Sequence, residues 1–186
     1  MSNDKKTTRG QILISNSTII SDEFNKTVVF MIEHDNAGAF GLVINKKSDY
    51  TLSEVIVGLP ENVSQNIPMY WGGPVDHSFI SILHNDTSFK DPGLLVIPGV
   101  FLSRSYDLLL SLLDSQSVNF KVFHGYSGWG AGQLESEFER KSWVLHSVND
   151  KFILDKEEEE AWREALKSKG GIYKYFADHT KDPLLN

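Results

Sequence analysis

The sequence predicts a single α+β domain built on an antiparallel sheet, and three observations support this class. Short apolar runs typical of strands recur between residues 11–15 and residues 120–126. Amphipathic stretches with helical spacing occur at residues 104–114 and again near the C-terminus. The two kinds of element do not alternate as βαβ units do, so a parallel sheet is disfavoured.

The length of the chain and its first residues set the domain boundaries. A chain of 186 residues fits one domain, which buries about 70% of the surface that its unfolded chain exposes. Residues 1–9 are polar and carry two lysines and an arginine, so we expect a flexible tail there. The domain is expected to cover residues 10–186, beginning with a short strand at residues 11–15.

A β-hairpin is predicted from residues 27–34 and 39–45. The first run is apolar on both faces, as in a central strand that is covered on both sides. Residues 35–38 (Asp-Asn-Ala-Gly) supply turn-forming residues between the two runs. This hairpin places His34 and Asn45 near strand ends.

The middle of the chain predicts a short helix, a close-packed turn and a further strand. Residues 51–59 have an apolar stripe of helical spacing, with Thr51 as N-cap and Glu54 three residues later. Residues 72–74 (Gly-Gly-Pro) indicate a tight turn. Residues 78–84 alternate as a strand does.

A second helix is predicted at residues 104–114, after turn-forming residues on either side of residues 94–97. Ser103 or Ser105 is available as its N-cap. Its stripe of leucines is typical of a buried helix face and consists of Leu108, Leu109, Leu112 and Leu113.

Residues 124–137 are the most informative stretch, because four glycines separate an apolar strand from a helix predicted at about residues 130–140. We expect these glycines to let the backbone reverse with positive φ and to let Trp129 pack close to the main chain. The favoured interpretation is therefore structural: the glycines serve backbone geometry and Trp129 anchors the corner in the core.

Three chemical interpretations of the same stretch compete with the structural one. A phosphate-binding loop would need Lys followed by Ser or Thr, whereas Gln133 follows the last glycine and acidic residues come next. A nucleophile elbow centred on Ser127 lacks its final glycine, because Trp129 stands there. A metal or acid–base site would combine His124 with Glu135 or Glu137, a spacing that matches no common ligand pattern.

The C-terminal region is predicted to form a hairpin followed by two helices. Residues 142–146 and 151–154 are the two arms of that hairpin. Asp155 with Glu158 resembles a capping box at the start of a helix that buries Trp162. A final short helix over residues 172–177 is expected to pack Tyr175 and Phe176.

Composition restricts the classes of function. The net charge is −7, the pI is near 5.3 and the basic residues are scattered, so direct nucleic-acid binding is disfavoured. Cysteine is absent, which excludes disulfides and thiolate chemistry. No run of eighteen apolar residues and no signal-peptide core occur. We expect a soluble cytoplasmic protein with no membrane contact and no cofactor.

The histidines do not form a recognisable metal motif. None of the six lies in an H-E-x-x-H sequence or in an i, i+4 pair. Histidine stands beside carboxylates at residues 33–35 and 84–86, both at predicted strand ends, where functional groups often gather. We assign no metal ligands. The six histidines are His34, His77, His84, His124, His146 and His179.

Five blocks of the sequence recur in one family order, at residues 10–14, 33–35, 38–45, 71–75 and 125–135. Taken together, they resemble the YqgE/AlgH family of largely uncharacterised bacterial proteins. The resemblance extends from about Gly10 to the C-terminal helices. It implies an α+β fold with a bifurcated, partly closed antiparallel sheet flanked by helices, and it brings no agreed catalytic residues. One branch is named as a transcriptional regulator of alginate synthesis, which implies a regulatory role here.

We therefore predict a non-catalytic, cytoplasmic regulatory or binding module that engages an unidentified protein or a small-molecule ligand. Its site is expected at the polar edge where the glycine turns and the first hairpin converge. The alternative is a hydrolase or metal-dependent enzyme that uses the Ser127/His124 corner or a histidine–carboxylate cluster. The candidate ligand-binding residues are His34, Asn45, Gly72, Gly73, Trp129 and Gln133.

Overall fold

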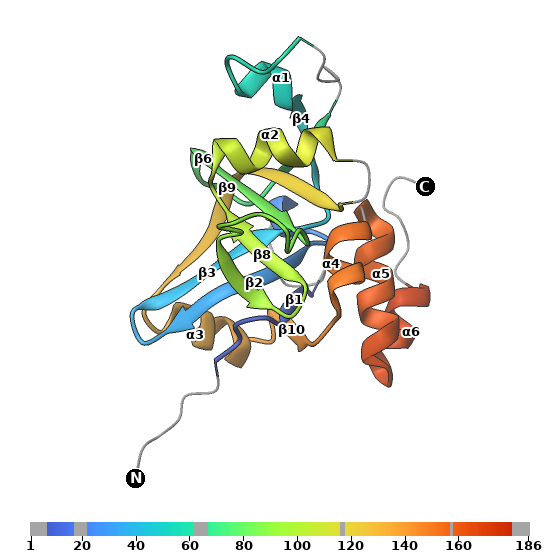
Figure 1. Ribbon diagram of the computed structural model, residues 1–186. Helices are drawn as coiled ribbons and strands as arrows, with labels where there is room; N and C mark the ends of the chain where they lie inside the picture. The colour runs from blue at the N-terminus through green and yellow to red at the C-terminus, as the bar shows by residue number, and fades with distance from the viewer. Residues whose placement is uncertain (1–6, 17–21, 62–66, 116–117, 157, 180–186) are drawn as a thin grey trace.

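The computed structural model describes residues 7–16, 22–61, 67–115, 118–156 and 158–179 (Figure 1). The strands are β1 (Ile12–Ser15), β2 (Val28–Asp35), β3 (Gly38–Val43), β4 (Lys47–Thr51), β5 (Pro68–Trp71), β6 (Val75–His84), β7 (Leu94–Ile97), β8 (Val100–Ser103), β9 (Phe120–Gly130) and β10 (Trp143–His146). The helices are α1 (Leu52–Val55), α2 (Tyr106–Asp114), α3 (Gln133–Glu139), α4 (Asp150–Asp155), α5 (Glu158–Lys169) and α6 (Ile172–His179), with a 3-10 turn at Asp22–Phe24.

The sheet branches at the long strand β9. The main path of neighbouring strands runs β10-β1-β2-β3-β9-β6-β8-β7, and its pairs are antiparallel. On the β3 edge of β9, Ser127 to Gly130 pair with β3, whereas Val122 to His124 pair in parallel with β5, whose other neighbour is β4. The bifurcated α+β fold implied by the family resemblance is thus confirmed.

The two outer strands of this path, β7 and β10, do not pair with each other. Within the described ranges no strand pair joins β7 to β10, so the sheet is not closed into a barrel. A side-chain contact partly bridges the gap, because Nη2 of Arg9, just before β1, donates to the carbonyl of Leu95 in β7 at 2.7 Å. Thr7 and Thr8 likewise contact His34, so these residues of the predicted tail are held to the sheet.

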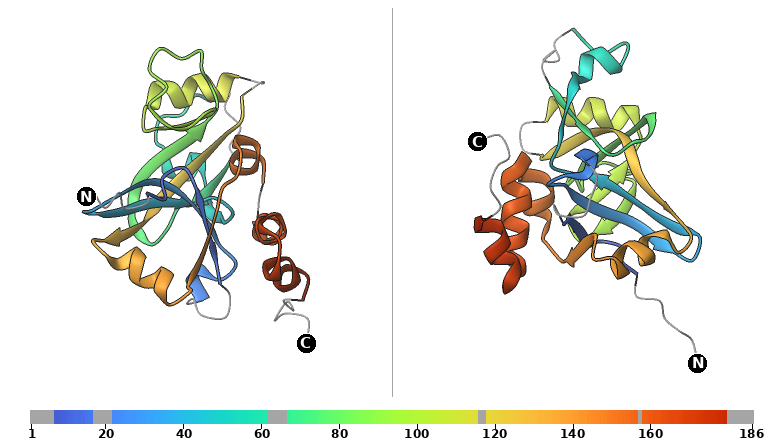
Figure 2. Two further views of the ribbon diagram at one scale, coloured as in Figure 1. Left: turned by 90° about the horizontal axis from the view of Figure 1, so that it is seen from below. Right: turned by 180° about the vertical axis from the view of Figure 1, so that it is seen from behind.

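Helices cover the sheet in three places, each over its own apolar cluster (Figures 1 and 2). The leucine stripe of α2 packs with Met69 and Val122, and Ser105 caps the helix by accepting from the N–H of Leu108. Trp162 of α5 is fully buried in a second cluster with β1 and β2. Leu134 of α3 packs with Trp129 and Trp143 in a third.

The first hairpin and several helices lie as the sequence predicts. β2 is buried from Val28 to Ile32, and Asp35 pairs with Gly38 across the turn to β3. The carboxylate of Glu54 accepts from the backbone N–H of Thr51, confirming the predicted helix start, although α1 ends at Val55. β4 precedes it and was not predicted, since its residues are polar and exposed on much of their surface.

The glycine-rich stretch does not reverse the chain where we predicted. β9 continues as a strand through Gly125, Gly128 and Gly130, and the turn comes only at Gly132, which has a φ of 76° directly before α3. Gly125 also has the predicted positive φ, of 67°, but it stays within the strand and allows close approach to Gly73. A Cβ there would lie 2.4 Å from the carbonyl oxygen of Gly73.

Three predictions for the C-terminal region are wrong. Residues 151–154 lie in α4, because the side chain of Asn149 caps this helix by accepting from the N–H of Phe152. Asp155 ends α4 and accepts from Asn119, so it does not cap α5. The rings of Tyr175 and Phe176 are 59% and 48% exposed, because α6 turns its Ala177 face inward instead.

Candidate functional site

The predicted glycine turn at Gly72 and Gly73 packs directly on β9. The N–H of Gly72 donates to the carbonyl of His124, and its own carbonyl accepts from the N–H of Val43 and the hydroxyl of Ser127. A Cβ on Gly72 would lie 2.3 Å from the carbonyl oxygen of Gly125. These two glycines therefore let the chain after β5 approach β3 and β9 more closely than any side chain would allow.

Beside this junction, two tryptophans are fixed by one carboxylate. Oε2 of Glu137 accepts the indole N–H of Trp129 at 2.8 Å and that of Trp143 at 2.7 Å. Oε1 of the same group accepts from Nε2 of Gln133 at 3.1 Å, while Oε1 of Gln133 accepts from the N–H of Gly130. The four side chains come from β9, β10 and α3, so the helix start sets the position of both rings.

These residues line a cavity of about 480 Å³, which we call the tryptophan cleft. Phe24 closes one side, with its ring edge-on to Trp143 at 5.7 Å between centroids. Arg140 brings a positive charge to a cleft that otherwise holds the carboxylate of Glu137. The lining residues are Phe24, Pro74, Ser127, Gly128, Trp129, Gln133, Glu137, Arg140, Ser142 and Trp143.

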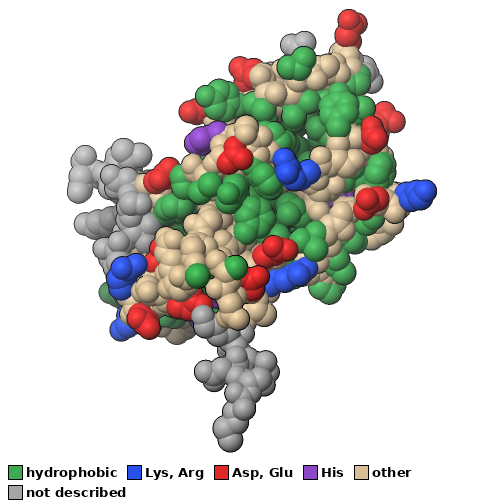
Figure 3. Space-filling view, turned by 90° about the vertical axis from the view of Figure 1, so that its left-hand side faces the viewer, with side chains coloured by type: hydrophobic (Ala, Val, Ile, Leu, Met, Phe, Trp, Pro, Cys, Tyr) green, Lys and Arg blue, Asp and Glu red, His purple; other side chains and the backbone are tan. Residues whose placement is uncertain are grey.

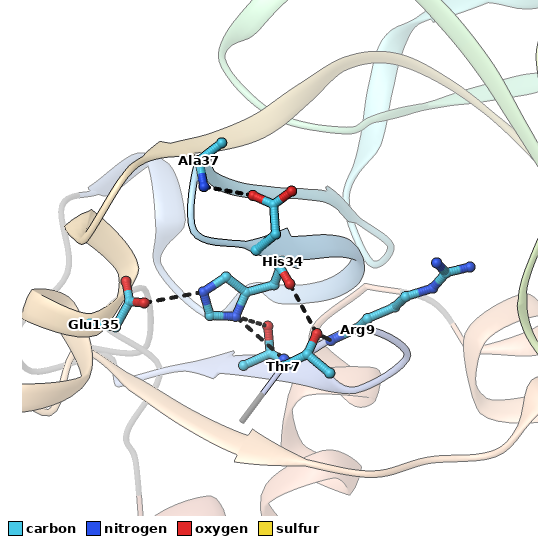
Figure 4. A network of polar contacts seen from close by, with 7 residues as sticks. Thr7, Arg9, His34, Ala37 and Glu135 are labelled. Atoms are coloured by element: carbon cyan, nitrogen blue, oxygen red, sulfur yellow. Dashed lines mark hydrogen bonds and ion pairs between the residues drawn. The ribbon is translucent and has the colours of Figure 1, made fainter. Parts of the chain in front are cut away.

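His34 lies on the side of α3 away from the tryptophan cleft and is held by a separate network of polar contacts (Figure 4). Its Nδ1 lies 3.1 Å from the hydroxyl and 3.3 Å from the backbone nitrogen of Thr8, and its Nε2 lies 3.5 Å from the carboxylate of Glu135. The ring thus joins the chain before β1 to α3. It does not line the tryptophan cleft.

Asn45 lies at the opposite end of the first hairpin and is buried. Its Oδ1 accepts from the N–H of Val28 at 2.8 Å, and its Nδ2 donates to the carbonyl of Lys26 at 2.9 Å. Of the six predicted site residues, the structure therefore brings Trp129 and Gln133 into one cleft. Gly72 and Gly73 adjoin it through Ser127 and Pro74, and His34 and Asn45 lie apart.

The predicted Ser127/His124 corner does not form a catalytic pair. The Ser127 hydroxyl is 1% exposed and donates to the carbonyl of Gly72 at 3.1 Å. The His124 ring instead lies against Ser48 and His77. The strand geometry of β9 explains this outcome, because an elbow requires a turn at the serine and here the chain stays extended.

A second and larger cavity, of about 730 Å³, surrounds His124, and we call it the histidine cleft. Ser48 of β4, His77 of β6 and His124 of β9 meet there. Sequence reasoning missed Ser48 and His77, because these residues are far apart in the chain and only the branch at β9 brings them together. Its lining residues are Glu23, Lys46, Lys47, Ser48, Asp49, Tyr50, Glu54, Val55, Trp71, His77 and His124.

Burial lowers the pKa of two basic groups in the histidine cleft. Burial, and to a lesser extent the neighbouring His77, lower the pKa of His124, which favours its neutral form. Burial also lowers the pKa of Lys46, although Glu23 opposes this shift. The Lys46 ammonium lies 5.5 Å from the centre of the Trp71 ring, so an aromatic wall and cationic groups occur side by side.

The histidine–carboxylate cluster at residues 84–86 is structural. Nε2 of His84 lies 2.8 Å from the carbonyl oxygen of Pro92, and its Nδ1 accepts from the N–H of Asp86. The ring is fully buried, and burial lowers its pKa. Within the described ranges, no group of three or more His, Asp or Glu side chains is placed to hold a metal ion.

One face of the molecule shows how its charged side chains are distributed. On the face drawn in Figure 3, lysine and arginine side chains stand singly and alternate with acidic ones around apolar patches. Nucleic-acid binding depends on clustered positive charge. Among the described residues, no helix combines the length and apolar character that crossing a membrane requires.

Comparison with known proteins decides the family. The family model described as DUF179, AlgH-like, matches residues 12–174. This chain belongs to the AlgH-like family. The resemblance inferred from the sequence blocks is thereby confirmed.

Curated relatives and solved structures agree with this membership. A UPF0301 protein of Chlorobaculum tepidum is 32% identical over 180 residues, which cover 95% of each chain. A UPF0301 protein of Cytophaga hutchinsonii is 32% identical, covering 96% of this chain and 99% of its own. The solution structure of the AlgH protein from Pseudomonas aeruginosa has a TM-score of 0.76 at 26% identity, covering 98% of this chain and 99% of its own. A crystal structure from Corynebacterium diphtheriae, with a TM-score of 0.74 at 17% identity over 95% and 94% of the two chains, shares the fold.

In this AlgH-like chain, the block at residues 125–135 frames the tryptophan cleft. It contributes the lining residues Ser127, Gly128, Trp129 and Gln133. The longest block of the family resemblance therefore lines a cavity, and within it Trp129 is buried against Leu134 and Trp143, so its predicted place in the core is confirmed.

Proposed function

We propose that this AlgH-like chain is a regulatory module of the cytoplasm that binds a small molecule in the tryptophan cleft. The observation that carries the proposal is the carboxylate of Glu137, which accepts hydrogen bonds from the indole groups of Trp129 and Trp143. Two rings fixed in this way present a preorganised aromatic surface, and preorganisation reduces the entropic cost of binding.

The chemistry of the lining indicates the class of ligand. The indoles of Trp129 and Trp143, which are 7% and 6% exposed, line the cleft with Phe24, so a planar ligand would meet aromatic edges there, which is a favourable contact. Arg140 stands at the same cleft and is suited to a carboxylate or phosphate, because its planar guanidinium pairs with such groups through two parallel hydrogen bonds. We therefore propose a planar, anionic metabolite such as an aromatic acid or a nucleotide.

The residues that line the tryptophan cleft favour binding of a ligand over its chemical conversion. Ser127 is a lining residue that could serve as a nucleophile, but its hydroxyl is already donated to the carbonyl of Gly72, and no histidine is among the described lining residues. A cytoplasmic role without direct nucleic-acid contact is supported by the net charge of −7 and the absence of cysteine.

A thermal-shift screen of nucleotides and aromatic acids tests the proposal, followed by titration of tryptophan fluorescence with each hit. Gln133→Ala and Arg140→Ala should each weaken binding about tenfold, as expected for the loss of one good polar contact. Gln133→Ala should lower the free energy of unfolding by only about 0.5 to 1.5 kcal/mol, because the side chain is exposed and loses its hydrogen bonds to Gly130 and Glu137.

Gln11→Ala is the matched control for Gln133→Ala, because Gln11 bonds to Ser147 and lies outside the tryptophan cleft. It should leave binding unchanged. The proposal is wrong if no compound of these classes stabilises the protein, or if a hit binds equally well to the Arg140→Ala and Gln133→Ala variants.

A further inference from the structure

The histidine cleft contains a serine with the surroundings of a nucleophile. Oγ of Ser48 lies 2.7 Å from Nε2 of His124. Nδ1 of His124 in turn lies 3.5 Å from Nδ1 of His77. This chain of contacts is outside the tryptophan cleft, and the proposed binding role does not use it.

The direction of the hydrogen bonds follows from a backbone donor. The N–H of Tyr50 donates to Oγ of Ser48 at 3.1 Å, so one acceptor site of the hydroxyl is already used. The hydroxyl hydrogen is then free to point at Nε2 of His124, which accepts it when the ring is neutral. In that tautomer Nδ1 carries the other hydrogen and donates toward His77, so each group donates to the next in one direction.

We propose that Ser48 is a nucleophile activated by His124, and that the histidine cleft transfers acyl groups from small carboxylic esters to water. A nucleophile within hydrogen-bond reach of a base that is itself oriented by a third group is the arrangement that covalent catalysis requires. His124 is the base, and His77 is a positioning residue that acts through it.

The reaction balances with water as the second substrate. Oγ of Ser48 forms a bond to the acyl carbon while its proton passes to Nε2 of His124. The ester C–O bond breaks, and the leaving alkoxide takes that proton as an alcohol. A water molecule then attacks the acyl-serine, giving its proton to His124, which returns it to Oγ as the carboxylic acid departs.

The cleft supports this chemistry around the serine. His124 is 6% exposed and neutral at pH 7, because burial lowers its pKa, so it can accept a proton. The rings of Tyr50 and Trp71 form an apolar wall for the acyl or alcohol group. Glu23, Asp49 and Glu54 line the cleft together with Lys46 and Lys47, so the two lysines offset this negative charge and are the lining side chains suited to the oxyanion that develops during attack.

The test is covalent labelling of the full chain by a fluorophosphonate probe, with mass spectrometry of the modified peptide, together with hydrolysis of p-nitrophenyl acetate. The folded protein should be labelled at Ser48, and heat-denatured protein should not. His124→Gln should slow labelling about a hundredfold or more, the usual contribution of a general base.

Variants distinguish the role of Ser48 from that of neighbouring residues. Ser48→Ala should abolish labelling and ester hydrolysis, whereas Ser53→Ala should change neither, since that hydroxyl contacts Thr51 at 3.3 Å. His77→Leu should slow labelling, and His77→Gln, which retains a hydrogen-bond acceptor, should restore it. EDTA should have no effect on either reaction.

Three results would overturn the proposal. The first is an absence of labelling in wild-type protein, which needs no variant to be interpreted. The second is labelling at another serine or equal labelling of His124→Gln that is folded by circular dichroism. The third is ester hydrolysis that EDTA removes and added Zn²⁺ restores, which would assign the histidine pair to a metal ion.

Discussion

The ammonium group of Lys121 lies 4.9 Å from the centre of the Tyr70 ring, inside the core. The side chain is 3% exposed, and Nζ donates to the carbonyls of Ile44 and Lys156. These carbonyls follow β3 and α4, so one lysine of β9 connects the centre of the sheet to the C-terminal helices.

Replacing this lysine should therefore destabilise the protein although the new side chain has a similar shape. Lys121→Met leaves two carbonyls without their donor, and we expect the free energy of unfolding to fall by about 1 to 3 kcal/mol in urea denaturation. Lys90→Met, at an exposed position, should stay within about 0.5 kcal/mol of wild type. Equal stability of the two variants would contradict this role for Lys121.

The carboxylate of Glu137 should matter for stability as well as for the proposed ligand. Glu137→Ala removes the acceptor of two largely buried indole N–H groups, so a loss of at least about 2 kcal/mol is expected by thermal or urea denaturation. Glu137→Gln keeps one oxygen acceptor and should lose less. Glu139→Ala, exposed on the same helix, is the control and should remain near wild type.

The contact between Gly72 and β9 predicts a sharp difference between two glycines. Neither Gly72 nor Gly130 has a positive φ, so only packing distinguishes them. A Cβ on Gly72 meets the backbone at 2.3 Å, and Gly72→Ala should cost about 3 kcal/mol or more, since the strands must separate. At Gly130 the nearest atom is 4.0 Å away, so Gly130→Ala should be tolerated. Comparable urea midpoints for both variants would show that the strands separate at little cost to accommodate the added methyl group, and would contradict this prediction.

Stability should decrease as the solution is acidified below the ordinary histidine pKa of 6.5. Burial lowers the pKa of His84 and His124 in the folded protein, so the unfolded chain takes up their protons first. The stabilisation is complete above pH 6.5 and is lost as the pH falls through the folded pKa values. Urea denaturation at a series of pH values should show this slope.

His84→Gln should flatten that pH dependence, because one of the groups that binds protons only on unfolding is gone. An unchanged slope in His84→Gln would mean that the buried ring is not responsible.

Sequence patterns predicted the parts of the fold that depend on neighbouring residues. The hairpin of β2 and β3 follows from a doubly apolar run and a four-residue turn, and α2 follows from its leucine stripe and Ser105. By contrast, residues 151–154 have too few positions to distinguish a strand from one helical turn. There the cap at Asn149 decides the structure.

The candidate site was predictable only where its residues are close in the chain. Trp129 and Gln133 lie on one strand-to-helix connection, so the glycine-rich block identified both. Trp143 and Glu137 complete the tryptophan cleft through indole contacts that no spacing in the sequence indicates. The histidine cleft depends on β4, β6 and β9 meeting, which is decided by the branched topology rather than by any local pattern.

The branch point at β9 also has a consequence for synthesis on the ribosome. Strands β3, β5 and β6 all pair with β9, so the hairpin has a hydrogen-bonding edge without its β9 neighbour while residues 44–119 are synthesised, and β6 has one while residues 85–119 are synthesised. Such edges are templates for association with other nascent chains. Ribosome-bound fragments that stop before Phe120 should be held by chaperones, and release should follow once β9 has emerged and joined the three strands in a single cooperative step.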